Sequence, residues 1–411
     1  MDTIIPILKS DKPLTPYRFY TDFLQSVATS YKDPTNKVVF KMFENGDEKE
    51  FDSTYRIDPI SIPLLLSLME QLCKYHKEPL KLLLFNNSAT KSVLEFLYRA
   101  DFFNVAGNNN NPIFPFGRNV VEFNDNYLGA FLGKTQRSEH RVRAYSLHED
   151  GLKEQLLRFE RDEEKRDYLN SHFTYKVKEH FGDLLFENEY TSQQHNSFID
   201  ILSELITNGV MHSNSETYAL MFSDRFATKF SISDNGIGLS NSMLEKENTF
   251  YYTSNSLKKE ISKIKSFDVK NERVLENLYV IFEVLYYSSL KDREGLFDLI
   301  VNVVLLGKGY FRIHTDNCQV VISNRMMNEL IVLNNLRKEI VKLHSDMLLG
   351  LLSQEKFKEN LTERTRNVKQ AFIQFYIKAL EKFSHDIKYS SIRFYGVRYR
   401  GVHIEVEIPN A

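Results

Sequence analysis

The chain has 411 residues, of which 42% are apolar and 26% charged, and these proportions exclude wholesale disorder and a fibrous repeat. Its 53 Lys and Arg against 55 Asp and Glu leave a formal charge of −2, so no global field attracts nucleic acid or an anionic membrane. At about 150 residues per domain, the length favours two or three domains.

Cysteine usage and the apolar runs indicate where the protein resides. Cys73 and Cys318 are far apart in sequence, which excludes a disulfide scaffold and a cysteine-based zinc site. The first residues, MDTIIPILKSDKPLTP, lack a signal-peptide pattern, and no uninterrupted apolar run reaches about 18 residues. We therefore expect a cytoplasmic protein that does not span a membrane.

Residues 1–135 are predicted to form a small α/β domain. An Asn-Gly pair at residues 45–46 is typical of a tight hairpin turn, because both central residues need positive φ. The expected elements in chain order are a hairpin of Val38–Phe43 with 48–51, a helix from Ser61 to about His76, a strand at Leu80–Phe85 and a helix at Lys91–Arg99. Residues 136–167 are rich in both charges and are predicted to be a helical linker.

The segment from Ser197 to His212 carries the first informative pattern. Its apolar residues recur at helical spacing, so we expect a helix with one face toward a core. Glu204, Asn208 and His212 are spaced by four, which places a carboxylate, an amide and an imidazole on one stripe of that helix. The simpler alternative is a solvated polar face.

The second pattern follows at Lys229–Leu239. Phe230, Ile232 and Asp234 share one face of a strand, so the carboxylate points the same way as two core residues and needs a partner. Gly236 and Gly238 allow the backbone to turn and to approach a flat ligand closely. A strand-ending turn without function is the alternative.

Together the two patterns resemble the asparagine box and the D-x-G-x-G box of the GHKL superfamily of ATPases, which includes gyrase, heat-shock chaperones, histidine kinases and MutL. The stretch ELITNGVMHS is most similar to the asparagine box of anti-sigma-factor serine kinases, and Arg293–Leu299 partly matches the glycine box. Gly401–Pro409 resembles the last strand of the family, and a hairpin is expected at Tyr310–His314 with Gln319–Ser323. The resemblance covers roughly residues 190–325 and 390–409. It implies an α/β (α+β) protein whose residues 168–411 form a Bergerat-fold sandwich with helical insertions.

The resemblance implies that ATP and Mg²⁺ are bound. Asp234 is similar to the carboxylate that accepts a hydrogen bond from the adenine amino group, and Gly236 and Gly238 to the residues that shape the adenine and ribose wall. Asn208 resembles the ligand that presents an oxygen to Mg²⁺. Glu204 resembles the general base that activates the attacking water or hydroxyl.

The same resemblance implies a phosphate-binding role for the glycine box. Gly295 at a helix start would direct backbone N–H groups to the phosphates, with Arg293 as a charge partner. His212 either faces the phosphates or packs as a hydrogen-bonded histidine. The box has one glycine where the family often has two.

Two long insertions depart from a minimal domain of this type. Residues from about 239 to 293 are expected to be the ATP lid, whose lysines 258, 259, 263 and 265 either approach phosphates or are simply solvated. Residues from about 324 to 388 are strongly helical, and we assign them to partner contact or dimerisation.

The expected function is an ATP-driven protein-interaction switch that hydrolyses ATP or transfers its γ-phosphate to a protein, as a bacterial ATPase or protein serine kinase. The first domain is weakly similar to STAS-like antagonist modules, in which a serine in the position of Ser88 accepts phosphate; Ser88 as a plain helix cap is the alternative. Rival functions are a dimerising mechanical ATPase of MutL-like or chaperone-like type and a nucleotide sensor without turnover. A sensor histidine kinase would need His148, which lacks the usual Arg-Thr-Pro after His-Glu-Asp.

Overall fold

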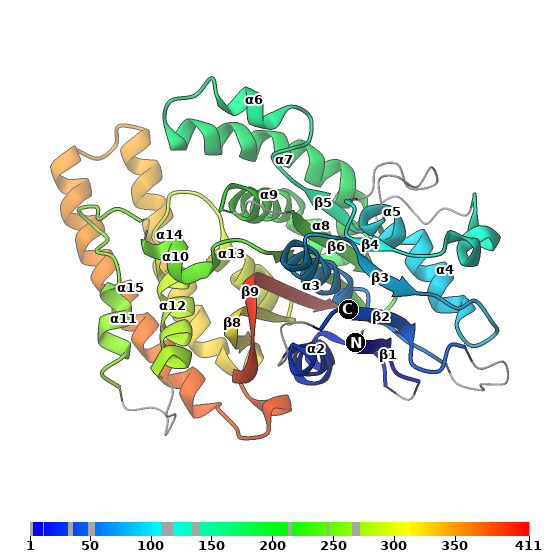
Figure 1. Cartoon of the computed structure of the whole chain (residues 1–411). Coiled ribbons are helices and arrows are strands. Elements are labelled where there is room, and N and C mark those ends of the chain that lie inside the picture. The colour runs from blue at the N-terminus through cyan, green and yellow to red at the C-terminus, as the bar shows by residue number, and fades with distance from the viewer. Residues whose placement is uncertain are drawn as a thin grey trace.

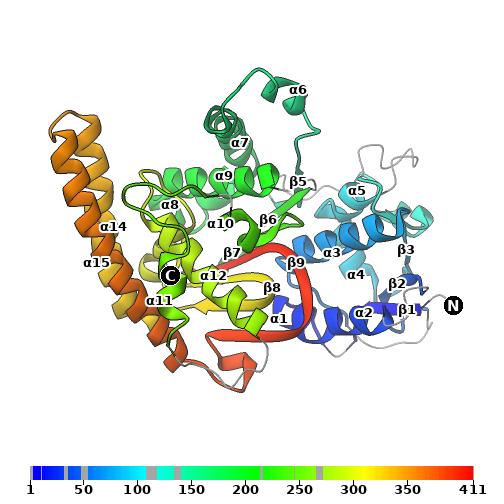
Figure 2. The same ribbon diagram turned by 60° about the vertical axis from the view of Figure 1, so that its left-hand side comes forward.

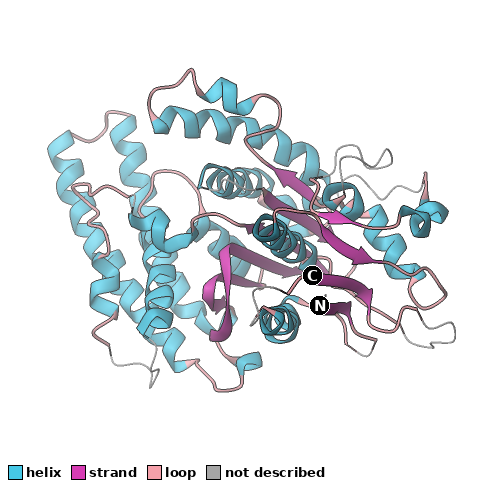
Figure 3. Ribbon diagram, viewed as in Figure 1, coloured by secondary structure: helices cyan, strands magenta, loops and turns pink. Residues whose placement is uncertain are grey.

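The protein combines a parallel and an antiparallel β-sheet with many helices, and its fold is mixed α/β (Figures 1 and 3). The computed structural model describes residues 3–10, 12–31, 36–47, 54–107, 118–133, 140–212, 216–244, 246–264 and 272–410. Within these residues no helix is both long and apolar enough to cross a bilayer.

The first sheet has four parallel strands in the order β1-β2-β3-β4. Helices connect its strands because parallel strands need crossover connections. The elements of this first unit are β1 (Thr3–Leu8), α1 (Pro16–Arg18), a π-helical turn (Phe19–Phe23), α2 (Leu24–Ser30), β2 (Val38–Phe43), α3 (Ser61–His76), β3 (Leu80–Leu83), α4 (Lys91–Arg99), α5 (Phe102–Ala106), β4 (Val121–Glu122) and a 3₁₀ helix (Asp125–Phe131).

The second sheet has five antiparallel strands in the order β5-β6-β7-β9-β8. Its strands are β5 (Arg143–Tyr145), β6 (Thr217–Ser223), β7 (Ala227–Asp234), β8 (Tyr310–Ile322) and β9 (Ile392–Pro409). Its helices are α6 (Leu152–Leu156), α7 (Asp162–Leu185), α8 (Glu189–Gln193), α9 (His195–His212), α10 (Gly238–Leu244), α11 (Ser256–Ile261), α12 (Glu272–Ser289), α13 (Leu296–Ile300) with a π-helical continuation (Val301–Leu306), α14 (Met327–Leu348) and α15 (Gln354–Glu381), with short 3₁₀ turns at Asn324–Met326 and Ile387–Tyr389.

Both faces of the second sheet are covered. Helices α7, α9, α12 and α13 pack on one face and bury a core that includes Phe230 and Ile232 of β7. Helices α2 and α3 of the first unit contact the other face, so they lie between the two sheets (Figure 2). Tyr218 and Leu220 of β6 therefore belong to the core of the first unit. The long hairpin of α14 and α15 extends along the side of the second unit (Figure 2).

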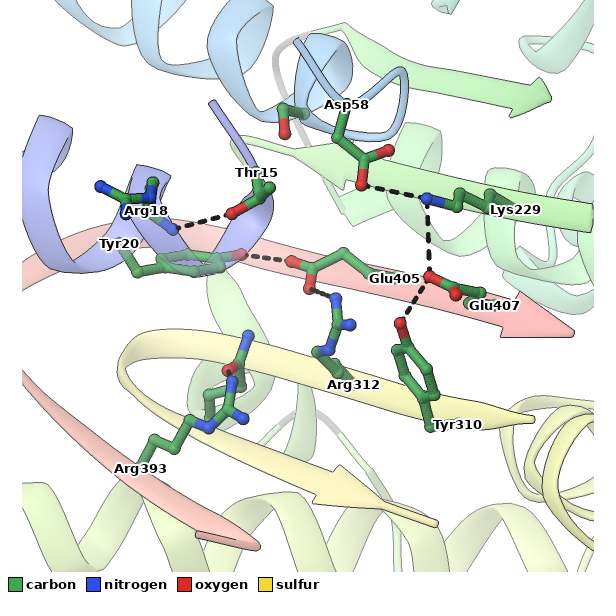
Figure 4. Close-up of polar contacts among 12 residues, drawn as sticks. Thr15, Arg18, Tyr20, Asp58, Lys229, Tyr310, Arg312, Arg393, Glu405 and Glu407 are labelled. Atoms are coloured by element: carbon green, nitrogen blue, oxygen red, sulfur yellow. Dashed lines mark hydrogen bonds and ion pairs between the residues drawn. The ribbon is translucent and has the colours of Figure 1, made fainter. Parts of the chain in front are cut away.

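The surface between the first unit and the second sheet is polar as well as buried (Figure 4). Glu405 of β9 is fully buried, accepts a hydrogen bond from Tyr20 at 2.7 Å and pairs with Arg312 at 3.3 Å. Lys229 of β7 pairs with Asp58 of the first unit at 3.2 Å. A buried charge is tolerated only with such partners, so these contacts fix how the first unit docks on the sheet.

The structure confirms most of the predicted elements of the first unit and adds others. The strand at 38–43, the helix from Ser61, the strand starting at Leu80 and the helix at Lys91–Arg99 are present. Strand β1 was not predicted, and it pairs with β2 in parallel. The hairpin expected at the Asn45–Gly46 turn is wrong: β2 pairs in parallel with β1 and β3, and neither Asn45 nor Gly46 has a positive φ. Its expected second strand, 48–51, lies outside the described residues.

Three predictions for the second unit need correction. The hairpin expected over 310–323 is wrong: β8 is one strand that pairs with β9 along both of its halves, with register shifts on either side of Asp316, whose φ is +56°. Residues 136–167 contain β5, which joins the second sheet, besides α6 and the start of α7. The lid expected over 239–293 includes α12, whose Leu278, Phe282 and Leu285 are fully buried, so that helix is part of the core.

Gly401 marks the bend of β9 beside the end of β7. Its φ is +102°, and an added Cβ would lie 1.8 Å from the carbonyl oxygen of Asp234. We expect Gly401→Ala to lower the free energy of unfolding by at least about 2 kcal/mol, because it combines an unfavourable backbone conformation with a clash against backbone. Urea denaturation followed by circular dichroism measures this, since the chain has no tryptophan.

Gly350 is the matched control for this substitution. Its φ is +69°, but nothing lies within 4 Å of an added Cβ. Gly350→Ala should therefore cost no more than about 1 kcal/mol. Equal effects of the two substitutions would contradict the close approach of β9 to the end of β7.

Candidate functional site

A pocket lies between α9, the end of β7, α10, α12 and the loop before α13. Five of the residues singled out in the sequence line it: Glu204, Asn208, Asp234, Gly238 and Gly295. Its remaining walls are Leu205, Gly209, Ile232, Ile237, Leu239, Ser242, Met243, Lys246, Val284, Tyr287, Ser288, Lys291, Leu296, Val402 and Ile404. The pocket is thus apolar with a few polar groups, which is typical of sites for small ligands.

Helix α9 supplies the carboxylate and the amide. Its apolar residues, including Ile201 and Ile206, are fully buried in the core beneath the helix. Glu204 and Asn208 lie one turn apart and face the pocket. Glu204 is only 3% exposed, and among the described residues its Oε2 atom has no hydrogen-bond partner. A buried carboxylate oxygen without a donor is free to accept a proton or hydrogen bond from a ligand.

Strand β7 supplies the second carboxylate. Asp234 is buried at the end of the strand, and its Oδ1 accepts a hydrogen bond from the N–H of Gly236 at 2.7 Å. Burial raises the pKa of Asp234 to about 7, against the lowering effect of backbone N–H groups that include that of Gly236. Gly238, at φ +77°, then turns the chain into α10. This carboxylate can accept a hydrogen bond from a ligand that enters over Gly238.

Asn235 connects the end of β7 to the first unit. Its side-chain amide donates to the carbonyl of Ser67 at 2.9 Å and to the carboxylate of Glu70 at 2.7 Å, and both residues belong to α3. Gln71 of the same helix donates to the Asn235 Oδ1 atom at 2.6 Å. The residue after Asp234 is therefore held by the helix on the far side of the sheet.

Cationic side chains gather near Glu204. Lys291 lies 3.8 Å from the Glu204 carboxylate, and burial together with the positive charge of Arg166 lowers the pKa of Lys291 to about 7. Arg166 of α7 bonds to Glu204 and donates to the Asn208 Oδ1 atom at 2.9 Å. Neither residue was singled out in the sequence. Lys291 stands two residues before the partial glycine-box match at Arg293, so that match could have pointed to it. Arg166 lies in a charged segment in which no motif indicates a site.

The glycine box is arranged differently from the prediction. The N–H of Gly295 donates to the carboxylate of Asp298 at 3.0 Å, so this donor is already used within the protein. Arg293 points to Asp167 at 3.1 Å and is not among the pocket-lining residues. The basic side chains that line this end of the pocket are therefore those of Lys291 and Lys246.

Arg337 of α14 holds the loop that carries Lys291. It is 2% exposed and donates to the carbonyls of Ser289, Lys291 and Arg293, and it pairs with Asp298 at 3.0 Å. A buried guanidinium that donates to several carbonyls holds that stretch of backbone in place, because the loss of any acceptor leaves part of its charge without a partner. The insertion at 324–388 is thus tied to the site.

The remaining predicted residues lie elsewhere. Gly236 supports Asp234 without lining the pocket, and the side chain of His212 lies outside the described residues. Lys258 pairs with Glu276 and Lys263 with Glu260, while Lys265 is outside the described residues. His148 lies in the loop between β5 and α6 and not on a helix.

Ser88 lies in the exposed loop between β3 and α4. The side chain of Asn87, not of Ser88, accepts the N–H groups of Ala89 and Thr90 in this turn. The turn belongs to the first unit, on the far side from α10 and α12 (Figures 1 and 2). Ser88 therefore does not face the pocket.

Comparison with protein-family models, with curated proteins and with solved structures finds no match for this chain. The described residues also contain no group of three or more His, Cys, Asp or Glu side chains that could hold a metal ion.

The raised pKa of Asp234 predicts a pH-dependent stability. The folded protein holds the Asp234 proton more tightly than the unfolded chain, so this contribution is fully present below about pH 4 and is lost as the pH rises through about 7. The Asp234→Asn variant has no ionisable group at this position, so its stability does not fall in this way as the pH rises. We expect the variant to gain stability relative to the wild type between pH 4 and pH 8, by on the order of 2 to 4 kcal/mol at 1.36 kcal/mol per pKa unit.

Urea denaturation of both proteins at several pH values tests this. Lys291 also has a shifted pKa, but it is present in both proteins and cancels in the comparison at each pH. A stability difference that does not change with pH would contradict the burial of an ionisable Asp234.

Proposed function

We propose that this protein is a Mg²⁺-dependent, ATP-binding protein of GHKL type that hydrolyses ATP or transfers its γ-phosphate to a protein, and so acts as an ATP-driven protein-interaction switch. The observation that carries the proposal is that Glu204, Asn208 and Asp234 line one pocket together with Lys291. Asp234 lies among apolar walls, and Lys291 and Lys246 supply basic groups. A nucleoside triphosphate needs both, an apolar place for its base and cations for its phosphates.

The adenine end is supported by Asp234 and by the apolar walls of Ile232, Leu239 and Ile404. An adenine ring is flat and carries an amino group, so it gains from apolar contact and from one buried acceptor. Gly238 offers no side chain that would obstruct the ring. The Asp234 carboxyl group has an oxygen that can accept this hydrogen bond in either protonation state.

The phosphate end is supported by Lys291 and Lys246 and by the amide oxygen of Asn208. A magnesium ion fits this set of donors, because it prefers oxygen ligands and in nucleotide sites takes most of them from phosphates and water. Asn208 would hold the ion through its Oδ1 atom. When bound, the ion neutralises phosphate charge and polarises the terminal phosphorus toward attack.

Glu204 has the position of a general base. Its Oε2 atom has no hydrogen-bond partner among the described residues, and it lies one helical turn from the proposed metal ligand. It would orient a water molecule or a protein hydroxyl and accept its proton. Lys291 at 3.8 Å balances part of the charge of the carboxylate.

The first unit is the part that we propose to be STAS-like, and it docks on the face of the second sheet opposite the pocket. Ser88 is exposed but does not face the pocket, so any phosphate it accepts would come from a second molecule. The placement favours hydrolysis, or transfer to a separate protein, over transfer within one chain.

A dimerising mechanical ATPase is the second candidate, and one observation favours it. Leu348, Leu349 and Leu351 are 84%, 70% and 71% exposed at the tip of the α14–α15 hairpin. Exposed apolar groups at the end of a projecting hairpin are typical of a contact with another protein.

The proposal is tested with ATP labelled at the γ-phosphate. We expect Asn208→Ala to abolish Mg²⁺-dependent binding, and Glu204→Ala to retain binding within a few-fold while losing at least about 100-fold in turnover, the usual range for a general base. Equilibrium binding and release of labelled phosphate measure the two effects. Label in free phosphate indicates hydrolysis, and label on protein indicates transfer.

Asn335→Ala is the matched control, because Asn335 is exposed on α14. It should change neither binding nor turnover. Turnover retained by Glu204→Ala would overturn the assignment of the base, and a wild-type protein that binds no ATP would overturn the proposed function.

A further inference from the structure

The start of α7 contacts Glu204 and Asn208, the proposed general base and the proposed metal ligand of the pocket. Arg166 lies in the second turn of this helix and bonds through its Nη2 atom to the carboxylate of Glu204. The same Nη2 atom donates to the Asn208 Oδ1 atom at 2.9 Å. One guanidinium therefore engages both the proposed general base and the proposed metal ligand.

This contact competes with the arrangement that turnover requires. If Asn208 held Mg²⁺ through its Oδ1 atom, the ion and the guanidinium of Arg166 would be two cations that compete for one oxygen. Two cations that share one oxygen repel each other, and the repulsion is stronger than in bulk water because Arg166 and Asn208 are partly buried. On Glu204, Arg166 engages the Oε1 atom and leaves the Oε2 atom open to a water molecule. The guanidinium must therefore leave the Asn208 Oδ1 atom before that atom can hold the ion.

A second feature indicates which kind of acceptor the guanidinium can bind instead. The Nε atom of Arg166 is buried and, within the part of the chain that the structure describes, has no hydrogen-bond partner. A buried charged donor without an acceptor is costly, so it points to an acceptor supplied by a ligand. Phosphate oxygens suit a guanidinium, which binds them with two parallel hydrogen bonds.

We propose that Arg166 is a binding residue for the terminal phosphate, and that it exchanges its bonds to Glu204 and Asn208 for bonds to that phosphate when Mg²⁺ and ATP enter. The inference rests on the proposed function and deepens it. The exchange frees the proposed metal ligand Asn208, together with the Oε1 atom of Glu204, only when a third phosphate is present. A diphosphate leaves Arg166 on Glu204, so the site distinguishes ATP from ADP.

The surroundings of Arg166 allow this exchange. Lys291 also lies 3.8 Å from Glu204, so Arg166 is not the only basic neighbour of this carboxylate. The next residue, Asp167, pairs with Arg293 in the loop before α13 at 3.1 Å. A movement of Arg166 would therefore displace the turn of α7 that contacts this loop through Asp167.

The test compares the affinities for ATP and for ADP, each with Mg²⁺, by isothermal titration calorimetry on the full chain. For Arg166→Gln we expect ATP affinity to fall at least 10-fold and ADP affinity to change by less than 3-fold. The control is Lys165→Gln, which removes the same charge one residue earlier, where Lys165 pairs with Asp162 on the surface. It should change neither affinity.

Arg166→Lys guards against a simple folding defect, because it keeps the charge and loses the paired donors. We expect it to retain part of the preference for ATP. An equal loss of ATP and ADP affinity in Arg166→Gln, or no loss of either, would overturn the role of Arg166 and leave the proposed function standing. A wild-type protein that binds neither nucleotide would overturn the proposed function and this inference with it.

Discussion

The antiparallel sheet β5-β6-β7-β9-β8 is buried on both faces, and this constraint determines most of the structure. One face packs against helices through apolar residues such as Ile232 and Ile404. The other face carries polar residues, including His403 and Glu405, that a solitary sheet of this kind would expose to water. Because the first unit covers this face, each polar group there needs a partner within the protein, as Glu405 has in Tyr20 and Arg312.

The same constraint links the pocket to the first unit. Asp234 points toward the pocket, while the next residue, Asn235, is held by Ser67 and Glu70 of α3. Any ligand that displaces the end of β7 would therefore also disturb α3. On the opposite side of the pocket, Arg337 holds the loop that carries Lys291, so the α14–α15 hairpin is connected to the site in a comparable way. Helix α3 and the α14–α15 hairpin therefore both contact the site through buried charged side chains, those of Glu70 and Arg337.

The sequence predicts the elements whose pattern is local. Helical spacing identifies α9 and places Glu204 and Asn208 on one face, and alternation identifies β7 with Asp234 facing the core. The sequence does not predict contacts that depend on tertiary structure. Nothing in the local pattern distinguishes Arg166 from the surrounding charged residues of α7, and the bend of β9 that lets it pair with both halves of β8 depends on Gly401 and on Asp316. The strand β1 is missed because its pairing partner lies beyond the intervening helices.

The central claim is that the pocket between α9 and β7 binds ATP with its adenine at Asp234. A crystal structure of the chain with Mg²⁺ and a non-hydrolysable ATP analogue tests this most directly. The account predicts the adenine amino group within hydrogen-bond distance of the Asp234 carboxylate and the phosphates beside Asn208 and Lys291. An analogue bound at another surface, or one whose phosphates lie at Asp234, would contradict it.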